Sequence, residues 1–417
     1  MHEESADLSI TQHESYAWRD VLAKLALLIF GIALWHKGFS FYIYIAAHYL
    51  LLLACFFDVN LNKIREIMKE PFVAGILILC TVMALGIIWS DDPNRGFRTL
   101  RRYSAFLFFI PYLALLNKKR LPWAIGGLLV GYFGVLATGI YQWLILEKQG
   151  IPALDIPYLH FSSMLGIGLL LTVYFTSTIH NFKIKLCLAP FSILLLFIQF
   201  NQNARGILIA TIISCVLLIF LIFKKKLRKF LIIITFFALL CGIFAVNNTN
   251  LQERIAQAKD DIALTKSGDY NTSLGLRFAW WDVGLQGISE KPLFGHGTGM
   301  VLHYFDKYVE TYKEGLYKNL PRLDHYHNDW IEIGMHIGML GLLAYTYFLW
   351  GWFQILKTNQ LGTLGAALVC FIFLCGITDL LVFFRQIIYL LLCITAIGIY
   401  WHRTYGINSV PITIKEN

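Results

Sequence analysis

Long apolar stretches are the feature that most constrains this chain. Of its 417 residues, 57% are hydrophobic and 15% are charged, whereas soluble domains carry about 25% charged residues. Because a helix needs about 20 apolar residues to cross a bilayer, a scan at that length predicts about twelve membrane-spanning helices. The predicted spans are residues 20–36, 39–57, 72–90, 104–117, 121–146, 157–179, 186–201, 206–223, 230–247, 330–356, 361–383 and 386–402. The chain is therefore predicted to be an all-α polytopic membrane protein.

One long polar segment, residues 248–329, separates predicted spans nine and ten. A transporter or channel needs no such loop, whereas an enzyme that works at a membrane surface does. We expect it to be partly helical and to carry the chemistry. The predicted parts are an N-terminal arm at 1–19, spans one to nine in 20–247, a catalytic loop at 248–329, spans ten to twelve in 330–402 and a tail at 403–417.

The distribution of Lys and Arg predicts the orientation, because these residues concentrate on the cytoplasmic side of membrane proteins. Four basic groups fall on one side of the predicted spans, and Lys224–Lys229 is the strongest of them. Both termini lie on that side. The sequence therefore predicts cytoplasmic termini and an outer long loop, which in a bacterial inner membrane lies in the periplasm. ATP is absent there, so a donor would have to arrive already activated, usually on a lipid carrier.

The outer side should be poor in cations, yet it carries arginines. Four of them, Arg95, Arg98, Arg101 and Arg102, follow the third span, and Arg277, Arg322 and Arg385 also lie outside. Arg offers a planar fork for bidentate phosphate contacts, whereas Lys is a point charge. The cluster therefore predicts a binding site for an anion, either a lipid phosphate or a lipid-linked pyrophosphate. Contact with anionic lipid without any catalysis is the alternative.

Arg205 stands where two apolar spans are joined by very few residues. A cation at such a place near the membrane boundary is a candidate for a functional site. Gly206 beside it allows a backbone or a ligand to approach closely. The alternative is that the Arg205 side chain only extends to lipid head groups on the outer side and has no functional role.

His327 lies where the polar loop enters the tenth span. Histidine suits general base catalysis near neutral pH, since its unperturbed pKa is about 6.5. Asp324, Asp329 or Glu332 could orient it, and the sequence does not choose among them.

Metal binding is the main chemical rival at this place. His325 and His327 could bind zinc, but no third ligand with suitable spacing is evident. The arginines can neutralise charge as a metal would. We therefore predict no metal.

At this point the chain resembles the bacterial O-antigen ligase family. His327, Asn328, Gly338 and Gly341 match a motif of that family. The motif consists of His, then Asn, Ser or Gln, nine residues, Gly, two residues and a small residue. Gly338 and Gly341 suit close helix packing beneath the site. An Arg-x-x-x-Leu motif is approximated at Arg205, with Ile209 in place of Leu. A second family arginine resembles Arg277, and residues 292–297 resemble a loop of these enzymes.

The resemblance implies a metal-independent, cofactor-free, membrane-embedded glycosyltransferase, GT-C-like in fold. Its donor would be O-antigen polysaccharide on undecaprenyl pyrophosphate, and its acceptor a terminal sugar of lipid A-core. Membrane lipids would surround it, and nucleic acid would have no role. Arg205 and Arg277 would hold the pyrophosphate, His327 would activate the acceptor hydroxyl, and the anomeric centre would invert. Further expected substrate contacts are Arg98, Arg102, Arg322, His325 and Asn328.

Three rival functions remain open. An O-antigen polymerase would use the same donor with a lipid-linked acceptor. A protein O-oligosaccharyltransferase is a further relative, although such chains tend to be longer. A flippase for lipid-linked oligosaccharides belongs to a different class, but the two halves of the chain show no convincing repeat of the kind found in transporters.

Overall fold

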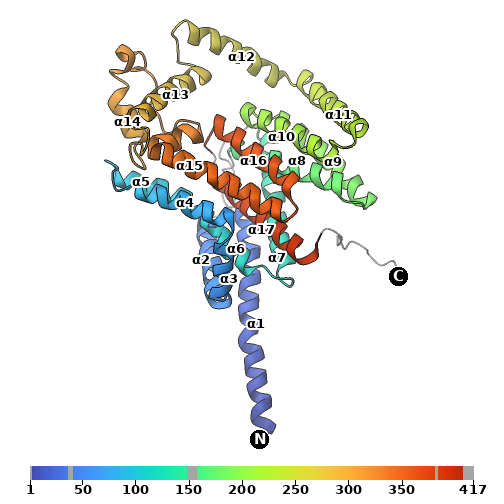
Figure 1. The fold of residues 1–417 in the computed structure, drawn as a ribbon. Coiled ribbons are helices and arrows are strands. Elements are labelled where there is room, and N and C mark those ends of the chain that lie inside the picture. Colours follow the sequence, from blue (N-terminus) through green and yellow to red (C-terminus); the bar gives the residue numbers. More distant parts are fainter. Residues whose placement is uncertain (1, 36–40, 148–156, 381–383, 407–417) are drawn as a thin grey trace.

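The computed structural model describes residues 2–35, 41–147, 157–380 and 384–406. These residues form helices and connecting loops, and no strand occurs among them (Figure 1). The first half comprises α1 (His2–Ile32), η1 (Ala33–Trp35), α2 (Phe41–Asp58), α3 (Leu61–Met68), α4 (Pro71–Leu85), α5 (Pro93–Tyr103), η2 (Ser104–Phe108), α6 (Phe109–Leu115), α7 (Leu121–Leu144), α8 (Tyr158–Thr178) and α9 (Phe182–Phe200). The second half comprises α10 (Arg205–Phe223), α11 (Leu227–Val246), α12 (Thr249–Lys266), α13 (Ser273–Glu290), α14 (Val301–Tyr308), η3 (Tyr312–Gly315), α15 (Asp329–Thr358), α16 (Gly362–Thr378) and α17 (Arg385–Tyr405).

The helices confirm an all-α protein with several membrane spans. In the described part of the chain, seven helices are long and apolar enough to cross a bilayer, or eight if α2 and α3, which meet at 116°, form one bent span. The seven are α7, α8, α9, α10, α11, α15 and α17. The helices α4 and α16 are apolar but shorter. The expected number of twelve is therefore not confirmed and stays a prediction.

The predicted span at 104–117 differs most from the structure. It consists of η2, with five residues, and α6, with seven residues. Seven α-helical residues rise only about 10 Å, far less than the roughly 30 Å of a bilayer core. The ends of the predicted spans at residues 36, 39–40 and 381–383, and the tail beyond residue 406, lie outside the described residues. The predicted arm at 1–19 is part of α1 from His2 onward.

The long polar segment is a folded unit rather than an open loop. The helix α13 packs against both α12 and the start of α15, and α14 packs against α13. These elements enclose a second, smaller hydrophobic core made of Ala279, Val283, Val301, Tyr304, Phe305, Tyr317, Leu323, Tyr326, Ile331 and Met335. Since Ile331 and Met335 come from α15, this core holds the segment on the helix that follows it.

The helix α15 is broken at Gly338, where φ is 61° and ψ is −148°. The break leaves backbone groups without their usual partners in the helix, and the loop after α13 supplies new ones. The backbone N–H of His296 donates to the oxygen of Met335 at 2.8 Å, and that of Met339 donates to the oxygen of Pro292 at 2.7 Å. A Cβ at Gly338 would lie 2.6 Å from the oxygen of Pro292. The close approach expected at Gly338 is thus to a loop rather than to another helix.

Gly341 lies just beyond this break. A Cβ there would meet side-chain atoms of Ile333 and Ile337, each at 2.9 Å. Gly341 therefore allows the two parts of α15 to pack closely where the helix bends.

Candidate functional site

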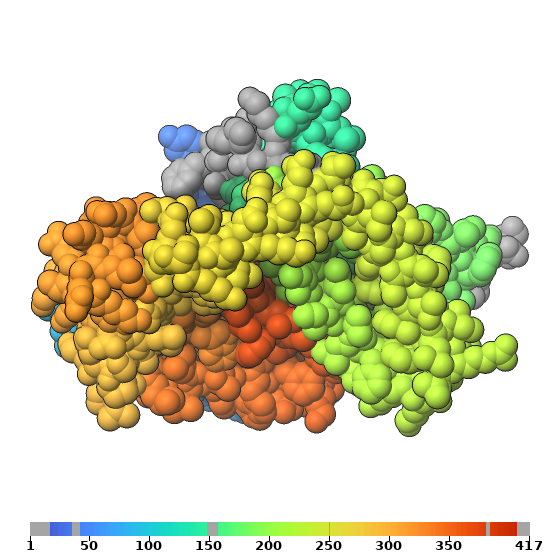
Figure 2. Space-filling view, turned by 90° about the horizontal axis from the view of Figure 1, so that it is seen from above, coloured from blue at the N-terminus to red at the C-terminus, as the bar shows by residue number. Residues whose placement is uncertain are grey.

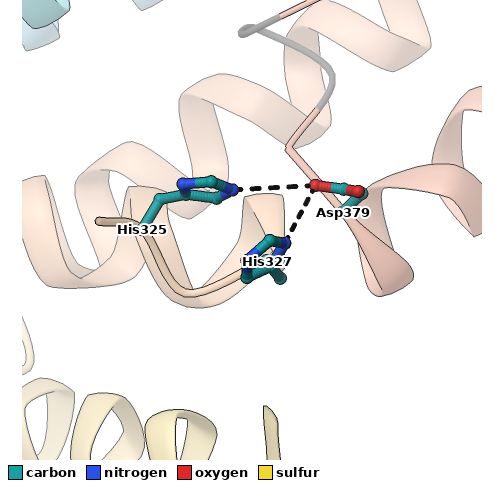
Figure 3. A group of neighbouring side chains, drawn as sticks. All are labelled: His325, His327 and Asp379. Atoms are coloured by element: carbon teal, nitrogen blue, oxygen red, sulfur yellow. Dashed lines mark hydrogen bonds and ion pairs between the residues drawn. The ribbon is translucent and has the colours of Figure 1, made fainter. Parts of the chain in front are cut away.

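His327 and Asp379 face each other at the junction of α15 and α16 (Figure 3). His327 precedes α15, and Asp379 follows the last residue of α16. The Nδ1 atom of His327 lies 3.2 Å from Oδ1 of Asp379, and the backbone N–H of Leu380 donates to the same oxygen at 2.8 Å. Because an ionised carboxylate only accepts hydrogen bonds, the imidazole donates from Nδ1.

The electrostatic setting keeps Asp379 ionised. Burial favours the neutral acid and by itself raises the pKa of this carboxyl group, which is only 3% exposed. The nearby His325, the hydrogen bond from His327 with its charge, and the N–H of Leu380 outweigh burial and lower the pKa of Asp379 well below its ordinary value. The carboxylate can therefore hold a histidine in one orientation near neutral pH.

His325 joins the same group from the loop side. Its Nε2 lies 3.8 Å from Oδ1 of Asp379, and its ring centre lies 4.0 Å from that of His327. Both imidazoles thus converge on one carboxylate oxygen (Figure 3).

Asn328 fixes the backbone that carries His327. Its side-chain oxygen accepts the N–H groups of Trp330 and Ile331 at 2.9 and 3.2 Å, which caps α15. Its side-chain nitrogen donates to the oxygen of Ile377 in α16 at 3.1 Å. His327 itself has a φ of 49°. One end of the Asn328 side chain therefore caps α15, and the other ties it to α16. The expected contact of Asn328 with substrate stays a prediction.

Trp280 of α13 covers one face of His327. The two rings are stacked, with centres 5.5 Å apart and planes inclined by 14°. The neighbouring Trp281 donates from Nε1 to the oxygen of Tyr326 at 2.8 Å, which anchors the loop before α15. Arg277 lies three residues before Trp280, so both side chains leave the same face of α13.

The three acids that the sequence offered as partners of His327 are exposed or bind other groups. Asp324 is exposed. Asp329 accepts the hydroxyl of Tyr345 at 3.1 Å, and Glu332 accepts the backbone N–H of Tyr326 at 3.1 Å. This expectation was wrong, because the carboxylate that binds the imidazole comes from the end of another helix.

Arg205 begins α10 and lies under α12. One of its terminal nitrogens donates to the backbone oxygen of Arg254 at 2.5 Å. Its guanidinium also interacts electrostatically with Arg254, Asp261 and Arg277. The charge of Arg277 thus acts on Arg205, and the contact with Arg254 is one that sequence reasoning missed. Three cations near one carboxylate form a positive cluster suited to an anion.

Gly206 connects this cluster to the histidines. A Cβ at Gly206 would lie 2.7 Å from the hydroxyl oxygen of Thr378, the residue before Asp379. The start of α10 therefore packs directly on the end of α16. Figure 2 shows α12 crossing above a hollow in which the red-orange residues that follow α15 lie between α10 and α15.

The remaining predicted arginines lie apart from this cluster. Arg322 is exposed and forms an ion pair with Asp306. Arg98 is exposed on α5, and Arg102 is half-buried at the end of that helix. The structure thus divides the predicted arginines into separate groups.

The group of His325, His327 and Asp379 also has the composition of a metal site. One ligand atom from each residue lies within 4.8 Å of the others. Two imidazoles and a carboxylate are donors that zinc accepts. The fold thus supplies the third ligand that the spacing of the sequence lacked. The 3.2 Å between His327 and Asp379 equally fits an ordinary hydrogen bond without a metal.

The fold and the site together define a multi-pass membrane protein with a histidine–carboxylate pair beside an arginine cluster. Residues 190–346 match the family described as O-antigen ligase. This match confirms the resemblance to that family over the segment that holds Arg205, Arg277 and His327. A further relative is an uncharacterized protein of Haemophilus influenzae, 26% identical over 291 residues, which are 66% of this chain and 69% of that protein.

Proposed function

We propose that this protein is an O-antigen ligase. It transfers O-antigen polysaccharide from undecaprenyl pyrophosphate to a terminal sugar of lipid A-core, at the periplasmic face of a bacterial inner membrane. The observation that carries the proposal is the packing of Gly206 on Thr378, since it places the start of α10, with its arginine cluster, beside the His327–Asp379 pair. Twelve spans, cytoplasmic termini and a periplasmic loop are part of the same proposal.

The arginine cluster is suited to the leaving group. As the bond between the sugar and the pyrophosphate breaks, negative charge develops on the departing oxygen. Arg205 and Arg277 stabilise this charge with their forked donors, and Arg254 adds to the positive potential. Loss of one such donor typically costs about 10²–10³ in rate.

The histidine is suited to the acceptor. Because Nδ1 of His327 donates to Asp379, its Nε2 is the nitrogen that is free to take a proton. The acceptor hydroxyl gives that proton to Nε2 while its oxygen bonds to the anomeric carbon and the pyrophosphate leaves from the opposite side. Asp379 stabilises the imidazolium that forms. A single displacement of this kind inverts the anomeric centre and uses no metal or cofactor.

The motif residues between His327 and Gly341 have a positioning role in this proposal. The cap by Asn328 fixes the start of α15 directly after His327, and the break at Gly338 lets the same helix bind the loop after α13. Trp280 restricts the ring to one plane. The base is thereby held ready before the acceptor binds.

An O-antigen polymerase is the second candidate, because it needs the same donor site and the same base. The two functions leave different products in a deletion strain. Without a ligase, long chains remain on the lipid carrier. Without a polymerase, the core carries a single repeat.

The test is the lipopolysaccharide profile of a deletion strain complemented with single variants. We expect His327→Ala, Arg205→Ala and Arg277→Ala to leave the core without polysaccharide, at normal protein levels. His303→Ala is the matched control, because His303 is exposed on α14 in the same folded segment. Normal ligation by the His327 or Arg205 variant would refute the proposal, and a single-repeat profile in the deletion strain would favour the polymerase.

A further inference from the structure

A buried acid lies directly behind the histidine pair. Glu332 stands in the first turn of α15 and is only 5% exposed. Its Oε2 accepts the backbone N–H of Tyr326, the residue between His325 and His327, at 3.1 Å. Glu332 therefore binds the backbone of the histidine pair, whereas Asp379 binds the imidazole of His327.

Both peptide groups that connect His325 to His327 are bonded to side chains. The N–H of Tyr326 donates to Glu332, and the carbonyl oxygen of Tyr326 accepts Nε1 of Trp281 at 2.8 Å. A buried N–H group without an acceptor is costly, and a hydrogen bond to a charged acceptor is stronger than one between neutral groups. Since Tyr326 is fully buried, Glu332 supplies an acceptor at a place that solvent does not reach.

The backbone of His327 has to be held from both sides. Its φ of 49° lies in the left-handed region, which residues other than glycine rarely adopt. Such a conformation persists only where the surrounding structure enforces it. The cap by Asn328 holds the chain after His327, and the bonds of Glu332 and Trp281 to Tyr326 hold the chain before it.

A second buried group, His336, faces the other oxygen of Glu332. Nε2 of His336 lies 3.6 Å from Oε1 of Glu332, one helical turn away, and the histidine is 1% exposed. Its Nδ1 accepts the backbone N–H of Gly299 at 3.3 Å. Because a neutral imidazole has one donor and one acceptor nitrogen, its proton is on Nε2, the nitrogen that faces the carboxylate. The positive end of this N–H dipole favours a negative charge on Glu332.

The loop after α13 fixes His336 in turn. The backbone N–H of Gly297 donates to the carbonyl oxygen of His336 at 2.9 Å, beside the bond from Gly299 to its ring. Thr298, between these two glycines, donates from its hydroxyl to the carbonyl oxygen of Met83 in α4 at 2.7 Å. The helix α4, this loop and α15 are therefore joined behind Glu332.

We propose that Glu332 is a positioning residue for His327, with His336 holding its carboxylate in place. This inference rests on the proposed function, in which His327 is the base. Glu332 acts through the backbone of Tyr326 and keeps Nε2 of His327 directed towards the acceptor hydroxyl. Its loss should therefore affect the alignment of the base in the reaction and not the binding of either substrate.

The test is steady-state transfer by the purified, full-length protein, with amide hydrogen exchange at Tyr326 measured on the same samples. Glu332→Leu removes both carboxylate oxygens at similar volume. We expect kcat to fall about 10- to 100-fold, the effect of one lost hydrogen bond to a charged group, and exchange at Tyr326 to become faster. KM for donor and acceptor should stay unchanged, because the base acts in the transition state.

The conservative variant Glu332→Gln separates the position of the oxygen from its charge. The amide keeps an oxygen that accepts the N–H of Tyr326, so kcat should stay within about threefold of the unaltered protein. His336→Phe keeps a ring of similar shape. It should lower kcat by itself but add no further loss to Glu332→Leu, because the two residues act as one unit.

Ile333→Ala is the matched control for lost stability. Ile333 is fully buried beside Glu332 in α15 but belongs to the larger hydrophobic core, whereas Tyr326 belongs to the smaller one. This variant should lower the midpoint of thermal unfolding without changing kcat. An equal loss of kcat in Ile333→Ala, a loss in Glu332→Gln as large as in Glu332→Leu, or additive losses in the double variant would overturn the inference.

The inference and the proposed function fail in different ways. Absence of any transfer by the unaltered protein would count against the proposed function. Full kcat in Glu332→Leu, or unchanged exchange at Tyr326 in that variant, would count against this inference alone. A change in KM in place of kcat would likewise show that Glu332 supports the binding of substrate and not the position of the base.

Discussion

The Nδ1 atom of His327 lies 3.2 Å from Oδ1 of Asp379, and this contact joins residues 52 positions apart in the chain. It sets which nitrogen of the imidazole carries the proton. It also ties the start of α15 to the end of α16, as the bond from Asn328 to Ile377 does beside it. The chemistry of the base and the packing of the two helices therefore depend on the same small region.

Asp379→Asn should reduce transfer strongly while the protein still folds. The amide has nearly the shape of the carboxylate but cannot stabilise an imidazolium, and it can turn its NH₂ group towards His327 and favour the wrong tautomer. We expect the rate of transfer to fall by about 10²–10⁴, as in other histidine–carboxylate pairs. Rates are measured on purified protein with saturating donor and acceptor.

The matched control is Asp324→Asn, which changes an exposed acid in the loop that carries His327. It should leave the rate unchanged. An equal loss in both variants would mean that general negative charge, rather than the bond to His327, supports the reaction.

The partner of His327 shows why sequence alone was insufficient for the site. Three acids lie within five residues of it, and proximity along the chain favoured them. Asp379 lies near the end of the predicted span 361–383, and only the packing of α16 on α15 brings it to the histidine. A single acid at the end of an otherwise apolar stretch was the available signal.

The arginine cluster shows which part of the site the sequence could suggest and which part it could not. The family resemblance predicted that Arg205 and Arg277 act together, and Arg277 is among the charges that act on Arg205. The oxygen that holds Arg205 belongs to the backbone of Arg254, and a backbone acceptor has no signature in the sequence. The apolar pattern likewise predicted helices throughout, but it could not show that residues 104–115 form two short pieces.

Chelation should leave the reaction unchanged, although His325, His327 and Asp379 have the donors of a zinc site. In the proposed reaction a proton, not a metal, lies between His327 and Asp379. Incubation with EDTA, followed by removal of the chelator, should therefore give the original rate. Metal content of the purified protein is measured in parallel. A loss of activity that zinc alone restores would show that the three residues bind a metal and that the proposed mechanism is wrong.

Gly206→Ala should lower activity by moving the start of α10 away from α16. The new Cβ would lie 2.7 Å from the hydroxyl oxygen of Thr378 and 2.9 Å from its Cβ. The displaced arginine would no longer be aligned with His327, and misplacement of about 1 Å can cost 10²-fold in rate.

A double variant gives the control for this effect. Thr378→Gly removes all three atoms that the new methyl group would meet, so Gly206→Ala combined with Thr378→Gly should recover activity relative to Gly206→Ala alone. Additive losses in the double variant would show that the two residues do not interact through this contact.

Gly338→Ala should lower the stability of the whole folded segment rather than break one contact alone. At a φ of 61° and a ψ of −148° the backbone conformation is nearly restricted to glycine, and such strain costs about 1–3 kcal/mol. The new Cβ would also lie 2.6 Å from the oxygen of Pro292, a backbone atom that itself accepts the N–H of Met339. The loop can yield only by giving up its bonds to α15. We therefore expect a lower midpoint of thermal unfolding and faster amide hydrogen exchange at His296.

Gly126→Ala is the matched control, because Gly126 lies within α7 and no heavy atom stands within 4 Å of a Cβ added there. Alanine favours a helix over glycine by about 0.5–1 kcal/mol, so this variant should be as stable as the unaltered protein or slightly more so. If Gly338→Ala matched it in both the unfolding midpoint and the exchange at His296, the break in α15 would not be what holds the loop. The position of His327, which depends on the same helix start, would then have to be maintained by Asn328, Glu332 and Asp379 alone.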